Sequence, residues 1–181
     1  MWRPFRKSSA AASADATWWR DASEIAGAPT EAAIAALEQR ATFDPIEDAD
    51  RQREMIAGLR QLAEIAASAD LPAVVTQHRV IGSDTCHFIG PASRVGGTDS
   101  SGKLFLTSTR LVLVTGAVAS WPWHRVTSVA RVDRDVIFSV SGGDAVHVRL
   151  NTFGEALVVH HLAERLSSRR TSGSHAGQSR I

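Results

Sequence analysis

The hydrophobic pattern changes its period along the chain. Before residue 72, apolar positions recur at helical spacing, as in Ile56, Leu59 and Ala63, which is typical of amphipathic helices. After residue 73, short apolar runs alternate with polar or glycine-rich breaks, which is typical of strands joined by turns. The pattern therefore predicts an α+β chain, with helices first and an antiparallel sheet second.

Two helices are predicted to form a hairpin over residues 29–71. The first covers residues 30–40. The second follows Asp44, the expected N-cap, and Glu47, which would complete a capping box. Because a lone hairpin cannot bury its apolar stripe, we expect it to dock on the rest of the chain or on another copy.

The two ends of the chain offer little for a core. Residues 1–28 are small, polar and of low complexity apart from their aromatic side chains, and they are predicted to form a flexible arm. Residues 169–181 contain mainly Ser, Arg and Gly and are predicted to be a disordered tail.

Residues 102–114, GKLFLTSTRLVLV, are mostly apolar, with a polar break from Thr107 to Arg110. Each half has the length of a strand, so the segment is predicted to be a β-hairpin. A membrane-spanning helix would need about 20 apolar residues and would not tolerate Lys103 and Arg110 at this spacing. No transmembrane segment is predicted.

About seven short strands are predicted in total, which favours a small barrel or sandwich. The Ser-Gly-Gly-Asp sequence at residues 141–144 is expected to be a hairpin turn. Thr152 and Glu155 form a capping box for a helix that would close the open end of the barrel. The expected strands lie at residues 74–81, 87–89, 104–107, 110–115, 126–132, 135–140 and 146–150.

The hairpin sequences GKLFLT, from Gly102, and RLVL, from Arg110, resemble the G-x-L-x-L-T-x-x-R-L hairpin of the GRAM branch of the pleckstrin-homology-like (PH-like) superfamily. A later strand near Pro122 and the closing amphipathic helix fit the same order of elements. The resemblance covers residues 73–168 and implies a small antiparallel PH-like barrel closed by a C-terminal helix. Trp121 and Trp123 depart from the family, which more often has aliphatic residues there.

Overall charge and cysteine content narrow the class of partner. The net charge is +1, from 20 basic and 19 acidic residues, so no global field favours nucleic acid. Cys86 is the single cysteine, which excludes a disulfide scaffold and indicates the cytoplasm. The amino-acid usage is that of a bacterial protein.

Catalytic and metal chemistry are not expected. His78, Cys86 and His87 lack a second ligand pair, and neighbouring residues of a strand face opposite sides. We therefore expect one of Cys86 and His87 in the core and the other on the surface. No nucleophile elbow or phosphate-binding glycine loop is present in the sequence. We predict no catalytic residues, no metal ligands and no cofactor. A small metal-dependent or hydrolytic enzyme is the weakest alternative for the function.

The Trp121-Pro122-Trp123 sequence is the most distinctive local motif, and it has two interpretations. Pro122 lacks an N–H group, so the segment should lie at an edge or a bend. The tryptophans would then cover the barrel mouth or receive the helices, or they would form a recognition surface with His124 and Arg125.

The favoured function is a non-catalytic docking module that binds a protein partner. The GRAM resemblance also permits binding to anionic lipid at the inner membrane face, through Arg94, Lys103 and Arg110. These three cations are widely spaced in the sequence, which favours protein docking.

Overall fold

The protein is described by a computed structural model over residues 9–43, 48–96 and 101–171. It divides into two compact units, Met1–Ala67 and Ser68–Ile181, which we name the helical unit and the sheet unit. Each unit is described by itself.

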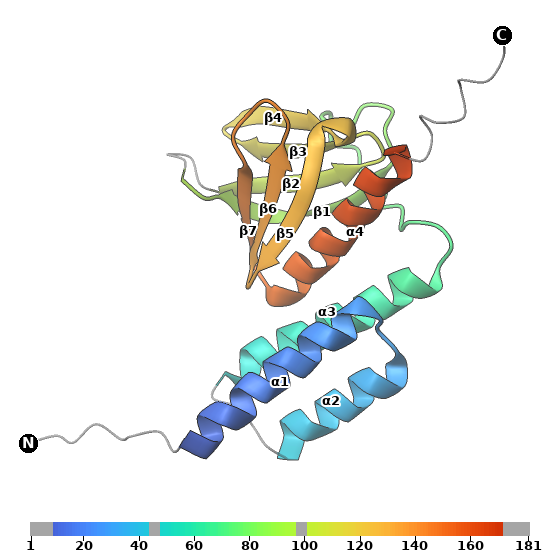
Figure 1. Ribbon diagram of the computed structural model, residues 1–181. Helices are drawn as coiled ribbons and strands as arrows, with labels where there is room; N and C mark the ends of the chain where they lie inside the picture. Colours follow the sequence, from blue (N-terminus) through green and yellow to red (C-terminus); the bar gives the residue numbers. More distant parts are fainter. Residues whose placement is uncertain (1–8, 44–47, 97–100, 172–181) are drawn as a thin grey trace, which may run out of the picture. The chain divides into compact units, whose positions relative to one another are not determined.

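The helical unit contains α1 (Ser9–Gly27), α2 (Glu31–Phe43) and α3 (Ala49–Ala67) (Figure 1). The predicted flexible arm is therefore wrong from residue 9 onward, since α1 occupies most of it. Its alanines favour a helix, and Trp18 and Ala22 are buried. The small residues that we interpreted as low complexity are good helix formers.

Two tryptophans of α1 connect the three helices. The Trp18 indole N–H donates to the carbonyl oxygen of Leu37 in α2 at 3.3 Å. The Trp19 ring lies edge-on to Trp18, with centroids 4.7 Å apart. The Arg51 guanidinium of α3 lies 4.3 Å from the centroid of the Trp19 ring. A buried donor and a cation–π contact thus fix α1 against both other helices.

The starts of α2 and α3 are both capped by a side-chain oxygen. Thr30 caps α2, because its Oγ1 accepts the Ala33 N–H at 3.3 Å. At α3 the cap is Asp48, whose Oδ1 accepts the Arg51 N–H at 3.0 Å. The predicted cap at Asp44 lies outside the described residues.

The sheet unit confirms the predicted fold class. All neighbouring strands pair antiparallel, in the order β4-β3-β2-β1-β7-β6-β5. A short 3₁₀ helix, η1 (Trp123–Arg125), joins β4 to β5. The strands are β1 (Cys86–Arg94), β2 (Ser101–Thr107), β3 (Arg110–Thr115), β4 (Ala117–Pro122), β5 (Val126–Val132), β6 (Asp135–Val140) and β7 (Val146–Leu150).

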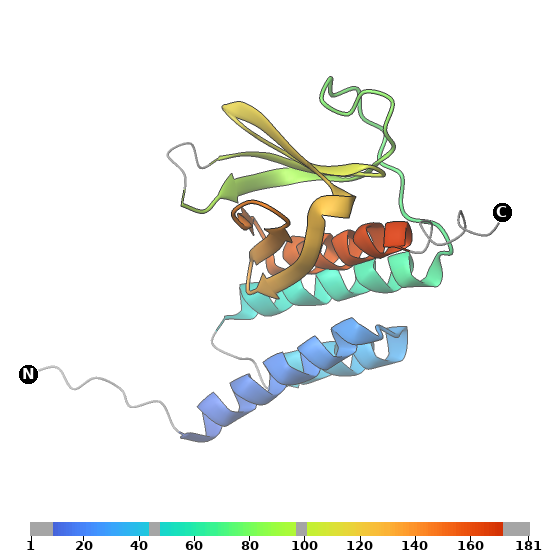
Figure 2. The ribbon, with the colours of Figure 1, turned by 45° about the horizontal axis from the view of Figure 1, so that its top comes forward.

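Helix α4 (Phe153–Thr171) lies across one face of the sheet (Figure 2) and packs on β5, β6, β7 and η1. Its predicted capping box is confirmed. The Glu155 N–H donates to Thr152 Oγ1 at 3.0 Å, and the Thr152 N–H donates to Glu155 Oε2 at 3.2 Å. The helix continues into the predicted disordered tail as far as Thr171, and residues 172–181 lie outside the described residues.

The β2–β3 hairpin is buried on both faces. Leu104 and Leu106 lie on one face, while Phe105 and Val112 pack on the other with Ile81. Strands that are covered on both sides have continuous apolar sequences. This double burial explains the apolar run of residues 102–114.

The outer face is covered by the segment of residues 72–85, which we name the strap. The strand predicted at residues 74–81 is wrong, because this segment forms no strand and packs on Phe105 and Val112 through Ile81. Turn bonds shape it, with the Ile81 N–H donating to His78 O at 3.0 Å. The Val74 N–H donates to Cys86 O at 2.8 Å. The seventh strand is instead β4, which the sequence pattern missed.

Candidate functional site

Trp123 belongs to the core. It is 1% exposed, and its indole N–H donates to the carbonyl oxygen of Thr107 at 2.7 Å. Pro122, with a φ of −60°, ends β4, and the chain turns into η1 at Trp123. The turn sends the side chain inward, so burial removes Trp123 from the hypothesised recognition surface.

The other three residues of that surface remain accessible in part. Trp121 is half-buried opposite Leu111, whereas His124 and Arg125 are exposed. Arg125 is also structural, because its Nη2 donates to Ser141 O at 2.9 Å and its own carbonyl accepts the Ser141 N–H at 2.8 Å. His124 and Arg125 thus stand exposed just before β5.

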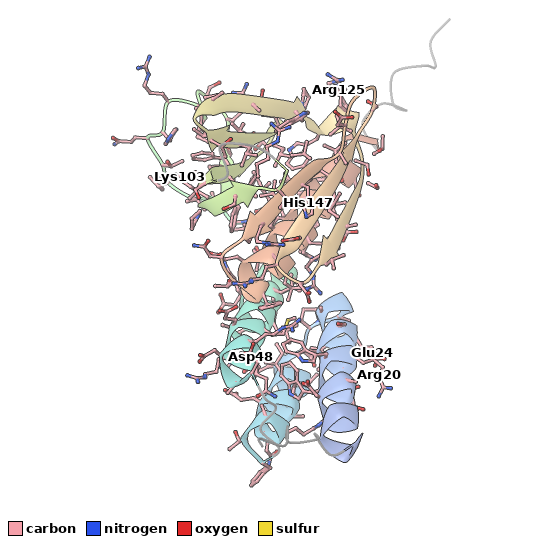
Figure 3. All side chains as sticks on the ribbon, turned by 90° about the vertical axis from the view of Figure 1, so that its left-hand side faces the viewer. Arg20, Glu24, Asp48, Lys103, Arg125 and His147 are labelled. Carbon is pink, nitrogen blue, oxygen red and sulfur yellow. The ribbon has the colours of Figure 1, made fainter. Side chains whose placement is uncertain are left out.

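The three cations of the lipid hypothesis are not brought together. Lys103 pairs with Val114, four residues along β3 from Arg110, a separation of about 13 Å at strand spacing. Lys103 lies opposite Pro91, and Arg94 follows Pro91 by three positions, so Lys103 and Arg94 lie on opposite faces. Figure 3 shows Lys103 well separated from Arg125 and His147.

Arg110 has a structural role that the sequence did not reveal. Its Nε lies 3.4 Å from Asp84 Oδ2, and its Nη2 donates to Val80 O at 3.2 Å, so it holds the strap to the sheet. The same carboxylate oxygen accepts the Thr109 hydroxyl at 2.6 Å and the Thr107 hydroxyl at 3.3 Å. Thr107 and Arg110, the T-x-x-R residues of the hairpin, therefore hold the strap against the sheet.

Cys86 and His87 are both buried, and the expectation that one lies on the surface is wrong. A bulge between Cys86 and Phe88 adds His87 to β1, so the strand no longer alternates there. His87 Nδ1 lies 2.7 Å from Pro72 O and its Nε2 lies 3.0 Å from Ser108 Oγ. Burial raises the pKa of the Cys86 thiol, which disfavours a nucleophilic thiolate.

Asp135, His147 and Arg149 form a paired cluster on β6 and β7. Arg149 Nε donates to Asp135 Oδ1 at 2.6 Å, and Arg149 Nη2 and His147 Nε2 each lie 2.9 Å from Oδ2. The hydrogen bonds from Arg149, followed by the one from His147, hold the pKa of Asp135 below its ordinary value. Both carboxylate oxygens are occupied, so the cluster stabilises the hairpin and is no general base.

Replacing Asp135 by asparagine is expected to reduce the loss of stability in acid. The lowered pKa of Asp135 means that its ion pairs stabilise the fold above about pH 4, and that this stabilisation is lost as the pH falls through the folded-state pKa. Urea unfolding near pH 7 and at about pH 3 measures the difference. Equal losses for the wild type and Asp135→Asn would contradict the assignment.

The edge of β5 exposes backbone hydrogen-bonding groups. The Leu150 N–H donates to Arg134 O at 2.9 Å. Successive residues of β6 direct their backbone groups alternately toward β7 and toward β5, so this bond determines which residues face which neighbour. Asp135 and Ile137 of β6 therefore bond to their partners Val132 and Ala130. Their neighbours Val129 and Arg131 direct their N–H and C=O groups away from the sheet, where an added strand could bind.

Arg131 is a half-buried cation beside this edge. It pairs with Val136, whose side chain is fully buried, so its side chain lies on the face that α4 covers. Its Nη1 donates to Asp133 O at 3.3 Å. Burial lowers the pKa of the guanidinium, partly offset by Asp133, so a further anion would stabilise its charge.

These groups together are named the β5 site. It consists of the exposed backbone groups of Val129 and Arg131, the Arg131 side chain, and the neighbouring His124 and Arg125.

Within residues 9–43, 48–96 and 101–171, no three His, Cys, Asp or Glu side chains are grouped to hold a metal ion. None of the helices in these ranges combines the length and apolar character that crossing a membrane requires.

Three solved structures illustrate what the fold resembles. The C-terminal domain of an unknown protein from Leishmania infantum is 13% identical, covering 49% of this chain and 89% of that one, with a TM-score of 0.41. The Vps36 N-terminal PH domain is 13% identical, covering 58% and 91%, with a TM-score of 0.42. The linker-DH/PH domains of p115-RhoGEF are 11% identical, covering 82% and 51%, with a TM-score of 0.44.

The sequence matches no protein-family model, and no curated protein matches it. The fold assignment depends on topology. The sheet unit is PH-like, because its seven antiparallel strands form one sheet that a C-terminal helix closes.

Proposed function

We propose that the sheet unit is a non-catalytic, GRAM-type docking module that binds an extended segment of a protein partner at the β5 site. The observation that carries this proposal is the edge of β5, where Val129 and Arg131 direct backbone groups away from β6. An added strand would gain main-chain hydrogen bonds there, the mode by which related PTB domains bind peptides.

The side chains of the site indicate an acidic partner segment. Arg131 is half-buried and its charged form is disfavoured by desolvation. A carboxylate beside it would form a charge-assisted, bidentate pair. His124 and Arg125 are exposed just before β5, at the opposite end of the strand from Arg131. They would favour a second acidic residue toward the other end of the peptide.

Lipid binding is the alternative that the geometry favours less. Arg94 and Lys103 lie on opposite faces, and Arg110 is engaged by Asp84 and the strap. An anionic headgroup is held best by cations that converge on it. We therefore expect the β5 site, and not these three residues, to determine binding.

The test begins with peptides selected from a random displayed library on the full chain. Calorimetry on the selected synthetic peptides is expected to show that they carry acidic residues and that Arg131→Glu weakens binding at least about tenfold. Val129→Pro is expected to abolish binding, because it removes an outward N–H group while the β5–β6 bonds remain.

The matched control is Arg94→Glu, which makes the same change of charge at an exposed arginine outside the β5 site. Its affinity for the peptides should equal that of the wild type. Equal weakening by both charge changes would contradict the β5 site. Sedimentation of the chain with phosphatidylserine vesicles, together with a failure to select any peptide, would overturn the proposal in favour of lipid.

A further inference from the structure

Strand β4 forms the other edge of the sheet, and its composition differs from that of β5. It pairs with β3 in continuous register from Ala117 to Pro122, and the sequence AVASWP carries no charge. Strand β5 has a bulge after Val126 and contains Arg131. A charged edge strand disfavours pairing with a strand of like charge, and a second copy of itself is such a strand. Strand β4, unlike β5, therefore carries nothing that opposes pairing with its own copy.

The pairing of β4 with β3 determines which backbone N–H and C=O groups of β4 point away from the sheet. The Trp123 N–H donates to Thr109 O at 3.2 Å, one position beyond the pair of Arg110 with Pro122. By alternation Trp121 and Ala119 bond to β3. Val118 and Ser120 therefore direct their N–H and C=O groups away from the sheet. Pro122 also falls at an outward position, where its missing N–H costs no sheet bond.

We propose that β4 pairs antiparallel with β4 of a second copy of this chain, with the two-fold axis at Ala119. In this register Val118 of one copy faces Ser120 of the other, and each such pair exchanges both backbone hydrogen bonds. The two sheets become one continuous sheet. Val118, which is 60% exposed in the single chain, loses exposed surface on pairing.

A second copy fits this edge because a two-fold axis brings each strand against itself. A charged strand would then meet like charges, which destabilises cross-strand pairs. The β4 sequence avoids that repulsion. The register also sets the large Trp121 opposite the small Ala117, and Ala119 opposite itself, so bulky residues do not collide. The inference is independent of the β5 site, which lies on the other edge.

Sedimentation velocity of the full chain over a hundredfold range of concentration tests the pairing. We expect a reversible dimer. Ser120→Pro removes an outward N–H without breaking a bond to β3, and is expected to give a monomer with an unchanged circular dichroism spectrum. Val118→Lys, a change at an exposed side chain, should also give a monomer because it brings two cations near the axis.

Cross-linking tests the register. Ala119 lies at a non-hydrogen-bonded position on the axis, where facing side chains are close enough for a disulfide, so Ala119→Cys is expected to form a covalent dimer under mild oxidation. Val132→Cys is the matched control, because Val132 is 62% exposed on the β5 edge. Cys86 is buried and should not compete.

A chain that stays monomeric at every concentration would overturn the proposal. So would a dimer that Ser120→Pro and Val118→Lys leave intact, because its interface would then lie elsewhere. Equal cross-linking through Ala119→Cys and Val132→Cys would show random collision instead of a defined register.

Discussion

Replacing Trp123 by alanine is expected to lower the free energy of unfolding by about 3–5 kcal/mol, the range for deleting a large buried aromatic side chain. The Trp123 ring is 1% exposed, so its removal leaves a cavity. The change also removes the donor that satisfies the buried carbonyl of Thr107, which adds an unpaired polar group. Urea unfolding followed by circular dichroism measures the loss.

Trp121→Ala is the matched control, because the two tryptophans are separated only by Pro122. Trp121 is half-buried, so its loss should cost about 1–2 kcal/mol, in proportion to the smaller buried area. Trp123→Phe separates the two contributions, since it keeps most of the ring but removes the indole N–H. Equal losses for Trp121→Ala and Trp123→Ala would contradict the different placement of these side chains.

Replacing Gly102 by alanine is expected to lower the free energy of unfolding by about 3 kcal/mol, the upper end of the range for overpacking. An added Cβ would collide with the backbone oxygen of Val114 and lie 2.8 Å from Thr115 Cγ2. The backbone cannot move aside without disturbing the adjacent pair of Lys103 with Val114. Thermal unfolding is expected to show a clear fall in Tm.

Gly143→Ala is the control for this substitution within the same sheet unit. Nothing lies within 4 Å of a Cβ added at Gly143, and the φ of this residue is not positive. The change should leave stability the same or raise it slightly, because alanine restricts the unfolded chain. A similar fall in Tm for both variants would show that close approach at Gly102 is not the cause.

Features that depend on neighbouring residues could be predicted from the sequence. The capping box of Thr152 and Glu155 forms as expected because both partners lie within one helical turn. The turn after Val140 forms because Gly142 takes a φ of +70° at little cost. The division of residues 102–114 into two strands is confirmed for the same local reason.

Features that depend on distant partners could not be predicted. The apolar pattern of the strap suits a strand as well as a covering segment, and only Phe105 and Val112 decide between them. Trp123 is turned inward by the 3₁₀ geometry after Pro122, where an extended strand would have kept it beside Trp121. The placement of Lys103 and Arg94 on opposite faces likewise requires the register between β1 and β2, which no local pattern encodes.

The double burial of the β2–β3 hairpin has a consequence for how this protein can diversify. Phe105 and Leu106 point to opposite sides and are both fully enclosed, so substitution at either is selected through folding alone. Substitutions that leave folding intact are therefore expected at the rim of the sheet, where side chains change without disturbing the interior. The sequence of this hairpin is for that reason set by folding more than by any property of the protein surface.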